Sequence, residues 1–420
     1  MQYFRNHFGY LDAQEVYLGK DQSNKDCYYH YVPLKDTIKS LFQDNLVRAQ
    51  FDCQPTKQPY SFCDFDDGEC VKNNTFFTSE ETLKILLFQD AFEIANPLGS
   101  ARTKHKILAV YFSLGNLYPH NRSKIDQIQL VMLCCDRYIK SFGANAIFDK
   151  LVDELQEIEK YGIDIGYETP IKGGLVLISG DNLGSHGLGG FVENFSACQY
   201  ICRYCEVKKE EIHENVLALG ILRTKESYAQ CLLELEQSEG LHVRGVKFNS
   251  PFNRLQNFHV CGPGLPPCIA HDLFEGVIAS DLHLFLKYLI QNEKWFTLDT
   301  LNQRILTFHY LDTDRNDKPS KVSLTSKKLS GHAFQNWNFL RLLPLIIGDM
   351  IQNYDHEVWQ LILILKEITC MVCCQSVTSS QLEYLQELVK LYLTTFVATF
   401  PEHQIKLYQA SLYVALCLSV

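Results

Sequence analysis

Two aspartates in this sequence stand where carboxylates commonly hold a metal ion. Asp181 follows the apolar run 175–178, which predicts a short buried strand, and a glycine-rich turn comes after it. Asp90 stands in a second strand-like run, at 83–92. A carboxylate at the carboxyl end of a strand is well placed to bind a divalent cation, although a glycine–aspartate–asparagine turn by itself is more often only a turn.

The elements that would position the two acids are three strands, a helix and a fourth strand. The strands are expected at 83–92, 106–114 and 125–134, and an amphipathic helix at 145–161 precedes the strand that ends at Asp181. This order is that of a ribonuclease-H-like core, in which the first and fourth strands are neighbours. The acids would then converge although they lie 91 positions apart. Such a pair can hold two Mg²⁺ ions that activate the attacking oxygen and stabilise the leaving oxygen at a phosphodiester.

A third acid normally completes such a site. Glu275, on a helix expected from about 268 to 290, is the best candidate, and Asp272 and Asp281 are its rivals.

The pair Cys202 and Cys205 has the spacing of half a zinc site, and two buried thiols are the alternative. Four residues are candidates for the second half: Cys268, His271, His259 and Cys261. A zinc ion held in this way would brace the inserted segment against the helix that carries the third acid.

Several other residues have less informative settings. Cys370 and Cys373 lie within an apolar helical stretch and are expected in the core, and His186 is expected on a solvent-facing turn. Three cations close to the first acid are interpreted as ordinary charges at a hairpin end rather than as phosphate contacts: Arg102, Lys104 and Lys106.

The composition is that of a globular protein. The 420 residues are enough for two or three domains, and 46% of them are hydrophobic. The net charge of −10 gives no overall attraction to nucleic acid, so a DNA-binding surface would have to be a local patch. The 16 cysteines and the absence of a signal-peptide pattern at the N-terminus favour a reduced, intracellular chain, and no long apolar run predicts a membrane span.

The fold class expected from these patterns is α/β, with a ribonuclease-H-like core (β-β-β-α-β), a zinc-braced helical insertion and an all-helical C-terminal region. The expected divisions are a mixed N-terminal segment at 1–80, the core with the first two acids at 81–205, the insertion at 206–267, a helix with the third acid and its following segment at 268–334, and the helical region at 335–420. A capping box at Ser380 and Glu383 would start the last helix.

Four blocks of sequence, in order, resemble one known family. They read QDAFEIANPLGSARTKHKILAVYFSLGN, GDNLGSHGLGGFVENFSACQYICRYC, FHVCGPGLPPCIAHDLFEGV and KLSGHAFQNWNFLRLLPLIIGD. Together they resemble the transposases of animal CACTA-like (EnSpm-type) DNA transposons and the host proteins derived from them. The similarity extends from about residue 32 to about residue 403.

The resemblance implies a DDE/D transposase core whose acids are matched here by Asp90, Asp181 and Glu275. The zinc ligands of the family are matched by Cys202, Cys205 and His271. The implied reaction is strand cleavage and strand transfer at transposon ends, with Mg²⁺ or Mn²⁺. DNA, further copies of the chain and a nuclear location are implied in the same way.

The chain also departs from the family pattern. It begins close to the resembling core, and the residues after His403 do not continue the family block, so we expect a truncated copy. A catalytically inactive, domesticated or decayed transposase that binds DNA or protein is therefore the alternative. A zinc-stabilised helical interaction module unrelated to nucleic acid is a third hypothesis.

Overall fold

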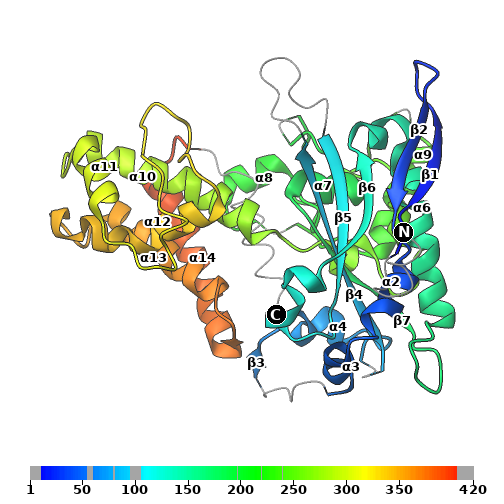
Figure 1. The fold of residues 1–420 in the computed structure, drawn as a ribbon. Helices are drawn as coiled ribbons and strands as arrows, with labels where there is room; N and C mark the ends of the chain where they lie inside the picture. Colours follow the sequence, from blue (N-terminus) through cyan, green and yellow to red (C-terminus); the bar gives the residue numbers. More distant parts are fainter. Residues whose placement is uncertain are drawn as a thin grey trace. The chain divides into compact units, whose positions relative to one another are not determined.

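The computed structural model describes residues 11–53, 60–78, 81–94, 106–195, 197–218, 220–238 and 240–403 (Figure 1). The chain divides into two compact units, each with its own hydrophobic core. The first unit comprises residues 1–59, 64–194 and 222–266, and the second comprises residues 60–63, 195–221 and 267–420. The segment expected as one insertion, 206–267, is therefore shared between the two units.

The first unit is mixed α/β and is built on a mixed sheet (Figure 1). In spatial order the strands are β1 (Gln14–Lys20), β2 (Asp26–Tyr31), β6 (Gln129–Cys135), β5 (Lys106–Leu114), β4 (Leu83–Glu93) and β7 (Gly173–Ser179). The pairing is antiparallel throughout except between β4 and β7, which run parallel. The four strands expected from the sequence are all present, and β1 and β2 extend the sheet beyond β6.

Helix α6 (Arg137–Tyr161) contributes one buried face to the hydrophobic core of the first unit. It starts earlier than expected and bends at Gly143, where φ is +84°, a value that glycine adopts without the steric cost of a Cβ atom. Its fully buried residues Ile147, Leu151 and Leu155 belong to the same core as the strands. The helix thus links β6 to β7 and makes their parallel crossover possible.

Short helices complete the first unit. They are α2 (Leu34–Leu41), α3 (Asn45–Asp52), η1 (Phe65–Asp67), α4 (Glu69–Lys72), α5 (Pro119–Arg122), η2 (Ile125–Gln127), α7 (Asn182–Leu188), α9 (Lys225–Glu236), η3 (Pro251–Arg254) and η4 (Val260–Gly264). Because η2 occupies the start of the third expected strand, β6 begins only at Gln129.

The second unit is mainly helical. Its helices are α8 (Lys209–Glu214), η5 (Ile269–Leu282), α10 (His283–Gln291), α11 (Leu298–Thr307), α12 (Ala333–Ile347), η6 (Gly348–Met350), α13 (Glu357–Val372) and α14 (Ser379–Thr399). A small ladder pairs β3 (Ser61–Phe62) with β8 (Val377–Thr378). Helix η5 has the wide turns of a π-helix, which occur mostly as short insertions in ordinary helices.

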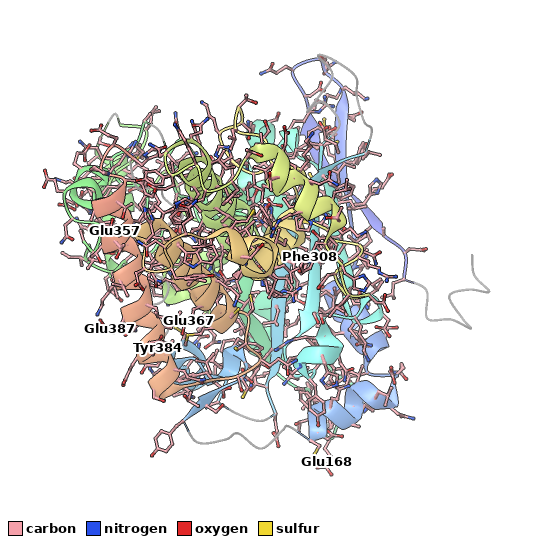
Figure 2. All side chains as sticks on the ribbon, turned by 90° about the vertical axis from the view of Figure 1, so that its left-hand side faces the viewer. Glu168, Phe308, Glu357, Glu367, Tyr384 and Glu387 are labelled. Carbon is pink, nitrogen blue, oxygen red and sulfur yellow. The ribbon has the colours of Figure 1, made fainter. Side chains whose placement is uncertain are left out.

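The last two long helices pack against each other, and Tyr384 Oη of α14 donates a hydrogen bond of 2.9 Å to Glu367 of α13 (Figure 2). The capping box of α14 is formed by Thr378 and Gln381, so the prediction of Ser380 and Glu383 was wrong by two residues. None of the helices within the described ranges is both long enough and apolar enough to cross a bilayer.

Candidate functional site

The two aspartates predicted to converge follow neighbouring parallel strands. The β4–β7 ladder ends with Phe88 paired to Ser179, and Asp90 and Asp181 each lie two residues beyond that pair. Paired strands lie about 4.8 Å apart, so the same register, continued beyond the end of β7, would bring the two acids to adjacent positions. The register itself is irregular, because Ile85 pairs with Leu175 whereas Leu86 pairs with Leu177.

The chain segments stay in contact beyond the last paired residues. A Cβ atom built on Gly180 would lie 2.9 Å from Cγ of Gln89, the residue before Asp90. A Cβ atom on Gly184 would lie 2.9 Å from Asp181 Oδ1 and 3.0 Å from Gln89 Nε2. Both glycines therefore allow a close approach that a larger residue would prevent.

Gln89 was not singled out from the sequence. It continues the series Leu83, Ile85 and Leu87, whose side chains are fully buried, and its own amide Nε2 is buried without a hydrogen-bond partner among the described residues. A polar residue at an inward-facing position of a strand is the sequence signal that would have identified it. It places a donor beside the turn that carries Asp181.

Both carboxylates are held by backbone N–H groups close by in the chain. Asp181 is the N-cap of α7, and its Oδ1 accepts a hydrogen bond of 2.6 Å from Gly184 N. Asp90 is exposed, and its Oδ1 accepts one of 2.8 Å from Ala91 N. Across the described part of the chain, neither aspartate forms an ion pair, so each keeps an oxygen that can bind a hard cation.

His186 lies in α7, five residues after Asp181. Its side chain is only 2% exposed and meets the ring of Phe191 edge-on at 6.0 Å, so the prediction of a solvent-facing turn histidine was wrong. The segment after Asp181 forms a helix rather than an open turn, and this helix directs His186 inward.

The candidates for the third acid all belong to the second unit and all have structural contacts. Glu275 Oε1 accepts a hydrogen bond of 3.1 Å from Ala333 N, at the start of α12. Asp272 Oδ2 accepts one of 3.0 Å from Cys268 N. Asp281 is buried, and its Oδ2 accepts one of 2.7 Å from Tyr392 Oη.

The zinc candidates of the second unit form two pairs. Cys202 and Cys205 are buried, and a hydrogen bond to Cys202 together with burial raises the pKa of the Cys205 thiol. Cys268 Sγ lies 3.1 Å from His271 Nδ1. Within the described ranges, no three or more histidine, cysteine, aspartate or glutamate side chains are arranged to hold a metal ion.

His259 belongs to the first unit instead. Its Nδ1 accepts a hydrogen bond of 3.1 Å from Cys261 N. Burial, together with the nearby Lys225 ammonium, lowers the pKa of this histidine to about 4. His259 is therefore neutral near pH 7, and Nε2 is the ring nitrogen that carries the proton.

The remaining predictions concern cysteines and surface cations. Cys370 and Cys373 are exposed, so the prediction that they lie in the core was wrong; α13 buries its other face, including Leu361 and Leu365. Lys106 begins β5 and is paired with Glu93 in the ladder. Two of the three cations near the first acid, Arg102 and Lys104, lie outside the described residues.

Comparison with known proteins adds no relative. No protein-family model matches the chain, and no curated protein matches it.

Proposed function

We propose that this chain is the catalytic core of a transposase-derived DDE/D nuclease, which cleaves DNA strands and transfers them with the help of a divalent metal ion. The observation that carries the proposal is the register of β4 and β7, which extends toward adjacent positions for Asp90 and Asp181. The order β6-β5-β4-β7, with α6 between β6 and β7, agrees with a ribonuclease-H-like core.

The two aspartates fit the needs of a hard cation such as Mg²⁺ or Mn²⁺. Each has one oxygen fixed by a backbone N–H group, so the carboxylates are oriented before an ion binds, and each has a second oxygen left for it. When bound, such ions activate the attacking oxygen and stabilise the leaving oxygen of a phosphodiester. Glu275 is proposed as the third acid because it matches that position in the family that the chain resembles.

Zinc bracing of the second unit is a further part of the proposal. Cys202, Cys205, Cys268 and His271 make up a three-cysteine, one-histidine set of the kind that holds structural zinc. Each pair already brings its two donors together, which supports the set. Among the described residues the two pairs are not arranged around one ion, so zinc binding would have to draw them together. His259 is left out of it, since the set already supplies the four ligands that structural zinc takes.

DNA at transposon ends is the proposed substrate, and a homo-oligomer in the nucleus is the proposed working form; both rest on the family resemblance. The net charge of −10 means that DNA contacts must come from local features of the surface.

Nicking of supercoiled plasmid tests this function. The purified chain is incubated with plasmid and Mg²⁺ or Mn²⁺, beside Asp181→Asn and Asp90→Asn variants. Asparagine keeps the cap of α7 but removes the charge, so we expect at least a roughly 100-fold loss of nicking with little loss of stability. Asp126→Asn, which changes an exposed acid elsewhere in the same unit, is the matched control and should nick normally. Equal nicking by all variants would refute the assignment of Asp90 and Asp181.

A non-catalytic DNA- or protein-binding module is the second candidate. It is favoured by the contact of Glu275 with the start of α12, which gives the proposed third acid a purely structural role. If a well-folded chain binds labelled DNA in a gel-shift assay but does not nick plasmid with either metal, this function replaces the first.

A further inference from the structure

A polar hollow of about 400 Å³ opens in the first unit, and its lining includes neither Asp90 nor Asp181. Its volume is within the range of small-molecule sites, about 300–1,000 Å³. The residues that matter for its chemistry are Asn73, Thr75, Lys225, Gln256, Asn257 and His259. A smaller hollow of about 150 Å³ shares part of this lining and reaches Val176 and Leu177 of β7.

Residues 256–257, which form part of the lining, are held in place by hydrogen bonds to their backbone. Glu159, a buried residue of α6, accepts hydrogen bonds from Gln256 N at 2.9 Å and from Asn257 N at 3.1 Å. Asn74 Nδ2 donates a hydrogen bond of 3.1 Å to Asn257 O, which connects the lining segment 73–75 to the segment 256–257. These contacts use backbone atoms of residues 256 and 257, so their side-chain amides are left to face a ligand.

The electrostatics of the hollow favour an anion. Lys225 is exposed in the first turn of α9 and, within the described ranges, forms no ion pair. His259 accepts the Cys261 N–H at Nδ1, so its Nε2 carries the ring proton and adds a donor. Glu226 is close enough to act on His259 electrostatically, but it lines neither hollow. A cation with no carboxylate partner at the rim is a typical setting for a phosphate group.

We propose that this hollow binds one nucleotide unit. The phosphate lies against Lys225, and the base lies against the amides of Asn73, Gln256 and Asn257. Asparagine and glutamine amides offer a donor and an acceptor side by side, which matches the paired donor and acceptor edges of nucleobases. The nucleotide is either free or part of a single strand, since the same groups recognise both.

Binding is measured on the full chain by calorimetry in EDTA, with deoxyadenosine monophosphate as the probe. Inorganic phosphate and deoxyadenosine are tested separately, and each should bind at least about tenfold more weakly than the nucleotide, because each makes only part of the contacts. Lys225→Met should weaken nucleotide binding on the order of tenfold. Lys140→Met, an exposed lysine of α6 outside the hollow, is the matched control and should change it less than about twofold.

A second variant, Gln256→Met, tests the base contacts without changing charge and should weaken the nucleotide but not phosphate. An adenine oligodeoxynucleotide that competes with the mononucleotide would identify a strand as the source, and lack of competition would identify a free nucleotide. Absence of binding, equal binding of phosphate alone, or equal effects of Lys225→Met and Lys140→Met in folded protein would overturn the proposal. Because the assay contains no metal, its result is independent of the nicking experiment.

Discussion

Two buried acids of the second unit are used differently from the two acids that follow β4 and β7 in the first unit. In the second unit, Asp281 is buried against Tyr392 Oη and Asp314 accepts a hydrogen bond of 2.6 Å from Arg341. Each of these carboxylates joins elements that are far apart in the sequence. Among the residues that the structure describes, the acids at the end of β4 and β7 instead accept hydrogen bonds from backbone N–H groups one to three residues away.

This difference separates acids that stabilise the fold from acids whose carboxylate oxygens can bind a ligand. A carboxylate that joins distant elements cannot be changed without leaving its buried partner unsatisfied. A carboxylate that is only locally oriented costs little to change, and its free oxygen can bind a ligand. The comparison can be tested by measuring the free energy of unfolding for matched variants.

The largest effect is expected at Asp281. Asp281→Ala leaves the buried Tyr392 hydroxyl without this acceptor and should lower the free energy of unfolding by about 2–3 kcal/mol, as measured in urea. Asp90→Asn, its counterpart in the first unit, should stay within about 0.5 kcal/mol of the unmodified chain. Equal losses in the two variants would remove the distinction between the units.

Glu159 sharpens the comparison, because it is an acid of the first unit with a structural role. Glu159→Ala removes the acceptor of two backbone N–H groups and should cost about 2 kcal/mol in the same assay. Glu159→Gln keeps one acceptor oxygen and should cost less. If the alanine variant is as stable as the unmodified chain, the wall of the nucleotide hollow is not held in the way described.

A smaller effect is expected at Asp181. Asp181→Ala removes the N-cap of α7 and should lower the free energy of unfolding by about 1 kcal/mol. The free energy of unfolding of Asp181→Asn should differ from that of the unmodified chain by no more than about 0.3 kcal/mol, because asparagine can also cap the helix. The difference between the two variants isolates the cap from the charge. A loss in the asparagine variant as large as in the alanine variant would contradict the local role given to this residue.

The smallest effect concerns pH and His259. The unfolded chain binds a proton at this residue near pH 6.5, whereas the folded chain binds it only near pH 4, so stability should fall as the pH drops through this interval. Because the ring is partly open to solvent, we expect a loss on the order of 1 kcal/mol. The His259→Gln variant should lack this part of the pH dependence in urea titrations at pH 6.5 and 4.5, and an unchanged slope would contradict the assignment.

The sheet could be predicted only in part from the sequence. The runs at β4 and β5 are continuous and apolar and end at turn residues, so their bounds were found almost unchanged. The strand β2 was missed because tyrosines occupy both of its faces. Tyr29 and Tyr31 are buried while Tyr28 is 45% exposed, and the identity of the residues hides the alternation.

The candidate site could also be predicted only in part from the sequence. Asp90 and Asp181 could be predicted to be neighbours, because strand order alone brings β4 beside β7. The role of Glu275 as a contact for Ala333 depends on how η5 packs against α12, which no local pattern contains. The nucleotide hollow combines three segments that are separated in the sequence, each of which is an ordinary polar loop or helix start by itself.

The irregular register of β7 makes the candidate metal site sensitive to the length of the strand. Val176 is the residue that the pairing skips; if it paired with Leu86 instead, the same counting would bring Gly180 rather than Asp181 opposite Asp90. Since successive residues of a strand face opposite sides, this shift would also turn the second carboxylate to the other face. Loss or gain of one residue between Leu177 and Asp181 would shift the second acid in the same way and disable the candidate site, although both aspartates would still be present in the sequence. The length of this strand must therefore be considered together with the acids when related sequences are compared.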